Sequence, residues 1–311
     1  MKRFVIKLFA LVVPVAVAFL IMNALYERTN YWKSKDYANK YTDAPYEIEL
    51  AGFGSSIPCY ALKFDVAPEV KAWNFSNVTE VYIWTYRVLK NYINHLAKGA
   101  VAVFELPYAE IDHRPESFRE RYYRVLPKED MDTWSFKEWL AYSKFPFLTA
   151  GKDKMRIFKD ISREEMSPYH DRYDADGEQR LKEFAENAYE GVSDEDDKDE
   201  EAYQKNFSDL CKLIDLCYEY GAVPVIVSYP VSDYVTKTYA RDPTFFDRFY
   251  GFVKELQQKY PDLVYMDYSH DNEFSNNNGY FKDAMHMNNA GAESFTRELI
   301  LQLRTRGLLK E

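Results

Sequence analysis

The sequence predicts an α/β fold, a three-layer α/β/α domain around a mainly parallel sheet, preceded by one transmembrane helix. Three observations carry this prediction. Short apolar runs alternate with segments of helical periodicity, each run ends in a turn of glycine, proline or serine, and a long uncharged stretch opens the chain. With 311 residues, 47% of them hydrophobic, the chain is long enough for one large domain or two ordinary ones.

The N-terminus has the pattern of a membrane anchor. Lys2, Arg3 and Lys7 precede an uncharged stretch, and residues 5–25 would make ~31 Å of helix, about one bilayer core. Because the positive flank favours the cytoplasm, we expect a single-pass protein of the cell membrane with its N-terminus cytoplasmic and its main domain extracytoplasmic. The alternative is a cleaved signal peptide, since Ala16-Val17-Ala18 resembles a cleavage site, although it lies inside the apolar stretch.

Four segments are expected along the chain. Residues 1–25 form the cytoplasmic tip and anchor, residues 26–45 a polar, Tyr-rich juxtamembrane linker or first helix, and residues 46–311 the main domain. A polar and acidic insert at about 171–204 interrupts that domain, and its composition predicts a mobile excursion on the surface.

The main domain is expected to alternate strands and helices. Strands are predicted at 46–53, 99–106, 223–228 and 263–267, and helices at 76–96, 210–220, 245–260 and 290–306. Ser76 or Asn77 is the expected cap of the first of these helices, with Glu80 near the capping-box position. Because ligands of parallel sheets bind at the carboxyl ends of the strands, a site is expected in the turns that follow them.

Two of those turns carry the residues of a serine nucleophile and its base. Ser56 follows Gly54-Ser55 at the end of the first predicted strand, and Asp283 stands three residues before His286 on a turn into the last helix. Attack on an acyl carbonyl needs a hydroxyl, a base within hydrogen-bond reach and a group that orients the base. We expect Ser56, His286 and Asp283 in these roles, with Ser55 as the alternative hydroxyl.

These motifs resemble the SGNH (GDSL-like) hydrolase superfamily. More narrowly, the chain resembles the membrane-anchored branch that includes the lipoteichoic acid D-alanylation protein and the alginate O-acetylation proteins. The matching stretches are Gly54-Ser55-Ser56, Trp73–Asn77, Tyr86–Lys90, Pro224–Pro230 and Asp283-x-x-His286 with its following Asn and Gly. The resemblance covers roughly residues 46–305 without the acidic insert, and it implies an SGNH-like catalytic domain of flavodoxin-like architecture.

The resemblance also implies an oxyanion hole, which this chain builds differently. The expected donors are the amide of Ser56 and a group near Ser76 or Asn77. The Gly-x-Asn-Asp motif of the superfamily is replaced by Glu105-Leu-Pro-Tyr-Ala-Glu110, so its asparagine donor is lacking. Loss of one donor typically costs ~10²–10³ in rate. Either Asn77 replaces it, or a partner does, or the protein is a poor free-standing hydrolase.

Composition excludes several other functions. A net charge of −10 argues against nucleic acid as a partner. No cofactor and no metal are expected. The pattern Asp174-Ala-Asp176-Gly177 resembles a calcium loop, but Arg172 stands at its first ligand position and cannot bind calcium. The resemblance instead implies a serine O-acyltransferase or esterase, assisted by a multi-pass membrane O-acyltransferase. The substrate of this chain would be a cell-envelope or secreted polysaccharide, or a teichoic-acid-like polymer. The alternative is a non-catalytic polymer-binding or assembly factor.

Overall fold

The computed structural model describes residues 2–29, 32, 39–78, 80–107, 111, 119–158, 177–190, 199–270 and 272–310. The chain divides into two compact units. The smaller combines Met1–Thr42 with Arg119–Pro168, and the larger combines Asp43–Phe118 with Tyr169–Glu311. The larger unit contains the sheet and all residues predicted to be functional.

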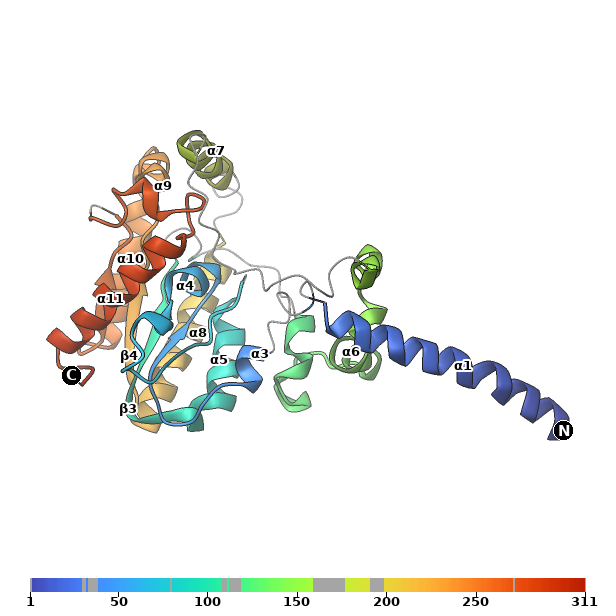
Figure 1. Ribbon diagram of the computed structural model, residues 1–311. Helices are drawn as coiled ribbons and strands as arrows, with labels where there is room; N and C mark the ends of the chain where they lie inside the picture. Colours follow the sequence, from blue (N-terminus) through green and yellow to red (C-terminus); the bar gives the residue numbers. More distant parts are fainter. Residues whose placement is uncertain are drawn as a thin grey trace. The chain divides into compact units, whose positions relative to one another are not determined.

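A five-stranded sheet, ordered β2-β1-β3-β4-β5, lies at the centre of the larger unit, and every pairing in it is parallel (Figure 1). The strands are β1 (Ile48–Phe53), β2 (Ala72–Asn74), β3 (Leu96–Glu105), β4 (Val223–Ser228) and β5 (Val264–Asp267). The predicted α/β class is thus confirmed. The sequence missed β2, a three-residue, half-buried edge strand.

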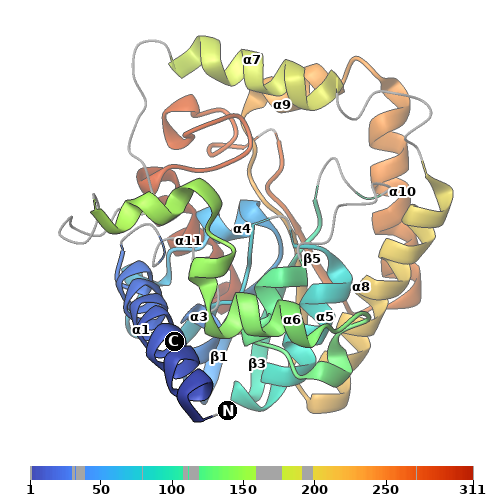
Figure 2. The same cartoon turned by 90° about the vertical axis from the view of Figure 1, so that its right-hand side faces the viewer.

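Helices cover both faces of this sheet, as the buried apolar residues of β1, β3 and β4 require. They are α4 (Ser56–Ala61), α5 (Tyr82–Tyr92), α8 (Glu200–Tyr220), α10 (Pro243–Lys259) and α11 (Asn289–Thr305). Two further helices, α7 (Gly177–Glu190) and α9 (Asp233–Tyr239), pack against each other. Helices α5 and α10 pack against α8, whereas α4 packs against α11 (Figures 1 and 2). This second pair carries the site described below.

The ends of these helices have local chemical causes. The Asp199 carboxylate accepts hydrogen bonds from the first backbone N–H groups of α8, and α8 ends at Gly221, whose φ of 81° suits a glycine. The Asn288 side chain caps α11 in the same way by accepting from the N–H of Gly291 at 3.0 Å. Both helices therefore begin on a side-chain cap that satisfies otherwise unpaired donors.

The predicted start of α5 at Ser76 or Asn77 is wrong. The helix begins at Tyr82, after Val81, and neither predicted residue caps it. The N–H groups of Phe75 and Asn77 instead donate to the carbonyls of Gly52 and Gly54, which continues the pairing of β2 with β1. Hydrogen bonds to the neighbouring strand thus hold this segment extended for two residues beyond β2.

The acidic insert contains a helix. Within its predicted range, α7 forms an amphipathic helix that packs against α9, and α8 begins at Glu200. Residues 171–176 and 191–198 of the predicted insert lie outside the described residues.

The smaller unit is built on α1 (Lys2–Glu27), whose residues Ile6–Glu27 have a mean hydropathy of 2.6 and are long and apolar enough to cross a membrane. Its last turns pack against the segment 144–157: the ring of Phe19 lies 5.4 Å from that of Phe145, and Asn23 accepts a hydrogen bond from the N–H of Phe147 at 3.1 Å. Of the predicted linker 26–45, the structure describes the end of α1, a short helix α3 (Asn39–Thr42) and the approach to β1, whereas residues 30, 31 and 33–38 lie outside it.

Candidate active site

Ser56 stands on a sharp turn between β1 and α4. Gly54 has a φ of 145°, in the region that favours glycine, and it reverses the chain between the strand and the helix. Ser55 caps α4, with its hydroxyl accepting from the N–H of Ile57 at 3.4 Å. Ser56 is therefore the first residue of the helix, where its N–H needs no partner within the helix.

Three side chains form a continuous hydrogen-bonded chain at this turn. The Ser56 Oγ lies 2.7 Å from the Nε2 of His286, and the Nδ1 of His286 lies 2.8 and 3.0 Å from the two carboxylate oxygens of Asp283. An ionised carboxylate only accepts, so Nδ1 carries the proton and Nε2 is left to accept from the serine hydroxyl. The structure thus brings together the three residues that the sequence predicted as nucleophile, base and orienting acid.

The turn that carries His286 is held rigidly from both sides. The N–H groups of Met285 and His286 donate to the Asp283 carboxylate at 3.1 and 2.9 Å, and residues Phe281 and Met287 form a β-bridge. Asn288 ties the turn to the preceding loop, donating from Nδ2 to the carbonyl of Gly279 at 2.7 Å. The acid therefore positions both the backbone and the ring of the histidine.

Backbone packing explains the Asn and Gly that follow His286, which are Asn288 and Gly291. A Cβ at Gly291 would lie 2.3 Å from the carbonyl oxygen of Tyr280, so only glycine permits this close approach. The same carbonyl accepts from the N–H of Asn288 at 2.9 Å. The block from Asp283 to Gly291 is thus one packed unit rather than a loop that happens to contain an acid and a base.

Hydrogen bonding keeps Asp283 ionised. Burial raises the pKa of this carboxyl, but the hydrogen bond from His286 and those from the backbone N–H groups of Met285 and His286 outweigh burial and hold the pKa below its ordinary value. The carboxylate therefore remains available to orient and stabilise a protonated imidazole at neutral pH.

Glu105 fixes the turn from the other side, and sequence reasoning did not assign it a role. It ends β3, is 3% exposed, and accepts from the N–H of Ser55 at 2.5 Å and from its hydroxyl at 3.0 Å. Ser55 is thus engaged by Glu105, whereas Ser56 faces the histidine, and this geometry favours Ser56 over Ser55 as the nucleophile. The sequence feature that could have identified Glu105 is a carboxylate at the end of a buried apolar strand.

The strand order explains why these groups meet. In a sheet ordered β2-β1-β3-β4-β5, the connections leave β1 and β3 in opposite directions, which opens a crevice at their carboxyl ends. Ser55 and Ser56 follow β1, and Glu105 ends β3, so both flank this crevice. The site therefore lies where ligands of doubly wound sheets bind.

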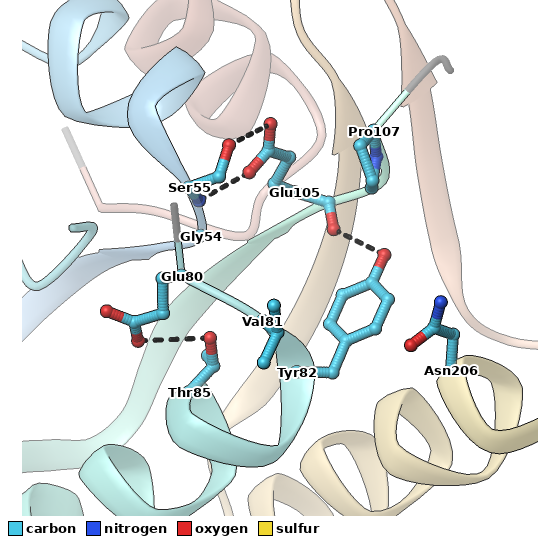
Figure 3. Close-up of a pocket in the computed structure, with 9 residues that line it drawn as sticks. All are labelled: Gly54, Ser55, Glu80, Val81, Tyr82, Thr85, Glu105, Pro107 and Asn206. Atoms are coloured by element: carbon cyan, nitrogen blue, oxygen red, sulfur yellow. Dashed lines mark hydrogen bonds between the residues drawn. The ribbon is translucent and has the colours of Figure 1, made fainter. Parts of the chain in front are cut away.

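A pocket with an empty volume of about 370 Å³, partly open to solvent, lies beside the turn (Figure 3). It is lined by Gly54, Ser55, Glu80, Val81, Tyr82, Thr85, Glu105, Pro107 and Asn206. The Tyr82 hydroxyl donates to the backbone carbonyl of Glu105 at 3.0 Å, and that of Thr85 donates to the Glu80 carboxylate at 3.1 Å. Ser56 and His286 do not line it, so the pocket adjoins the Ser55 side of the turn.

Ser76 and Asn77, the predicted oxyanion residues, lie next to the turn of Gly54, Ser55 and Ser56 and are fully buried. The N–H of Asn77 is occupied by the carbonyl of Gly54 at 2.9 Å. Neither its Nδ2 nor its Oδ1 has a hydrogen-bond partner within the described part of the chain, and both atoms are closed off from solvent. An oxyanion role for the Asn77 amide would therefore require a local opening, and it stays a prediction.

Two further side chains adjoin the histidine. The Tyr60 ring, one turn after Ser56 on α4, meets the His286 ring edge-on with centroids 5.2 Å apart. The Nζ of Lys282 lies 3.0 Å from the centroid of the Tyr60 ring. Sequence reasoning singled out neither residue.

The described residues contain no group of three His, Cys, Asp or Glu side chains that could hold a metal ion. No protein-family model and no curated protein matches the chain. Among solved structures, it is similar to the crystal structure of a "putative acylhydrolase" from Bacteroides fragilis, with a TM-score of 0.40 and 10% sequence identity over 88% of this chain and 95% of that chain. A TM-score below 0.5 says nothing about activity, so the function proposed below rests on the geometry of this chain.

Proposed function

We propose that this protein is a serine-dependent O-acyltransferase or esterase that works through an acyl-Ser56 intermediate. One observation carries the proposal: the unbroken hydrogen-bonded chain from the Ser56 hydroxyl through His286 to Asp283. Such a chain is the arrangement that activates a serine for attack on a carbonyl. The motif resemblance to SGNH hydrolases supports the same chemistry.

In the first half-reaction, Ser56 Oγ attacks the acyl carbonyl and its proton moves to Nε2 of His286. Asp283 holds the ring and offsets the charge of the imidazolium. The tetrahedral intermediate collapses, the bond to the donor oxygen breaks, and that oxygen takes the proton from Nε2. The ester left on Ser56 is then attacked by a sugar or polyol hydroxyl, or by water, whose proton passes through Nε2 back to Ser56 Oγ.

The oxyanion would be stabilised first by the N–H of Ser56, at the N-terminus of α4. Asn77 is the proposed second donor, because its amide is held next to the Gly54 turn and is not engaged by another described residue. A second donor of this kind is worth ~10²–10³ in rate.

The cellular setting follows from α1 and the resemblance. With α1 as a single-pass anchor, the larger unit works outside the cytoplasm on a cell-envelope or secreted polysaccharide, or on a teichoic-acid-like polymer. Because activated acyl donors are made inside the cell, a multi-pass membrane O-acyltransferase would deliver the acyl group, and acetyl is the group that the resemblance favours.

A second candidate function is a non-catalytic polymer-binding or assembly factor for that acyltransferase. The observation that favours it is the complete burial of the Asn77 side chain, which withholds one of the two proposed donors from a developing oxyanion. Under this alternative, Ser56, His286 and Asp283 would keep their hydrogen bonds but would not turn over an ester.

Acylation of the full-length chain in detergent tests the proposal. The protein is mixed with p-nitrophenyl acetate, and the intact mass and the peptide that carries the acetyl group are followed by mass spectrometry. We expect one acetyl group on Ser56, lost in Ser56→Ala and retained in Ser55→Ala. No acylation and no ester turnover by the wild type, with polymer binding intact, would favour the assembly factor.

A further inference from the structure

Lys282 belongs to the turn that carries Asp283 and His286. It directly precedes Asp283, and its N–H donates to the carbonyl of His286 at 2.9 Å. Its ammonium lies over the ring of Tyr60, 3.0 Å from the centroid, and that ring in turn contacts the ring of His286. Since Tyr60 stands four residues after Ser56 in α4, one aromatic ring separates the ammonium from the nucleophile and its base.

The Lys282 ammonium has no carboxylate partner in the described part of the chain. Within the described residues, Lys282 makes no ion pair, and its Nζ donates no hydrogen bond to a side chain or carbonyl. The neighbouring acid, Asp283, is occupied by His286 and by two backbone N–H groups. Lys63 gives the contrast: its Nζ donates to both Asn289 and Glu293 at 2.5 Å.

Keeping Lys282 half-buried without an acid partner is unfavourable for its charge. Burial lowers the pKa of Lys282, while Asp283 and Cys59 act in the opposite direction. A half-buried ammonium gains most from an anionic group that comes within hydrogen-bond distance. A second cation reaches the same segment, because Arg180 of α7 donates to the carbonyl of Lys282 at 2.8 Å.

We propose that Lys282, supported by Tyr60, forms an anion subsite that binds a phosphate or carboxylate group of the acceptor beside the hydroxyl to be acylated. This subsite rests on the proposed function, because it selects the substrate that resolves acyl-Ser56. The acceptor hydroxyl loses its proton to Nε2, its oxygen bonds to the acyl carbon, and the bond to Ser56 Oγ breaks and takes that proton. Lys282 holds the neighbouring anion and so aligns the hydroxyl.

Deacylation of preformed acetyl-Ser56 measures this selectivity on the full-length protein. The acceptors are two matched pairs: glycerol 3-phosphate with glycerol, and glucuronate with glucose. Acyl transfer and loss of acetyl from Ser56 are followed by mass spectrometry, and the rate of Ser56 acylation is measured with each compound present as a competitor. The quantity compared is the anionic-to-neutral ratio within each protein, so that a general loss of activity cancels.

We expect at least one anion to be preferred roughly tenfold by the wild type, the order of effect of one hydrogen bond to a charged group. Lys282→Gln should bring the ratio close to one, Lys282→Arg should restore it in part, and the matched control Lys63→Gln should keep it. A preference within the glycerol pair indicates that the subsite binds phosphate, and a preference within the glucose pair indicates that it binds carboxylate.

Equal treatment of the anionic and neutral compounds by the wild type, in both transfer and competition, would overturn the subsite. So would a preference that persists in Lys282→Gln. Either result leaves acyl-Ser56 intact as an intermediate, whereas failure of Ser56 to be acylated at all would count against the proposed function itself.

Discussion

Gly54→Ala is the sharpest test of how the nucleophile turn is built. Gly54 has a φ of 145°, and a Cβ there would lie 2.6 Å from both the Cβ and the Oε2 of Glu105 and 2.8 Å from the Cγ of Pro58. Glu105 cannot move aside freely, because its carboxylate holds the N–H and hydroxyl of Ser55. The added methyl group must therefore push β1 and β3 apart or displace the turn.

Two contributions set the size of the effect. A side chain held in this backbone region costs about 1–3 kcal/mol, and overpacking of a filled site costs about 1–3 kcal/mol more. We therefore expect the free energy of unfolding of the larger unit to fall by roughly 2–6 kcal/mol. A shift of Ser56 by about 1 Å relative to His286 would slow acylation by about a hundredfold.

Chemical denaturation and the rate of acylation by p-nitrophenyl acetate measure the two effects. Gly251→Ala is the matched control. Gly251 lies in α10, and an added Cβ there would meet no described atom within 4 Å beyond its chain neighbours and the backbone of its own helix, so alanine should be neutral or stabilise by about 0.5–1 kcal/mol. A Gly54→Ala protein as stable and as fast as Gly251→Ala would refute the proposed construction of the turn.

Three further changes give separable outcomes. Asp283→Asn should slow acylation by up to about 10⁴, because the amide no longer fixes the imidazole tautomer. The same variant tests the pKa of Asp283, which lies below its unfolded value of about 3.9. The difference in unfolding free energy between wild type and Asp283→Asn should therefore be constant above about pH 5 and shrink as the pH falls below 4. A difference that grows with acid would contradict the lowered pKa. Glu105→Ala should destabilise by about 3–6 kcal/mol, because two hydrogen bonds to a buried charge are lost, and Glu105→Gln by less; equal denaturation midpoints for both variants would count against this role. Removal of residues 1–29 should make the segment 144–158 cleave faster in limited proteolysis, because Phe145 and Phe147 lose Phe19 and Asn23, and an unchanged cleavage rate there would disprove the packing.

The parts of the fold that the sequence predicted well are those fixed by local pattern. The bounds of β4 were predicted to the residue, because an apolar run between Gly221 and Pro230 leaves little freedom. The edge strand β2 was missed, since three half-buried residues show no alternation. The start of α5 was misplaced because its apparent caps are held by β1, and a cap preference cannot reveal that contact.

The same distinction separates the predicted from the missed site residues. Ser56, His286 and Asp283 stand in turns whose glycine, asparagine and spacing are visible in the sequence. The Glu105 carboxylate binds Ser55, which stands 50 residues earlier in the chain, so its role becomes visible only in three dimensions. Lys282 resembles any turn lysine until its contact with Tyr60 is seen.

The hydrogen bond between Ser56 and His286 joins residues 230 positions apart, so its length depends on how α4 and α11 are held together. A fully buried threonine of α11, Thr296, accepts from the N–H of Lys63 at 2.9 Å and donates to the carbonyl of Ala61 at 3.1 Å, just where α4 ends. The side chain of Lys63 continues this link to Asn289 and Glu293 on α11. Ser56 therefore begins α4, and His286 lies on the turn just before α11. Polar bonds join these two helices at the far end of α4, so helix packing, rather than either turn alone, determines the distance between Ser56 and His286.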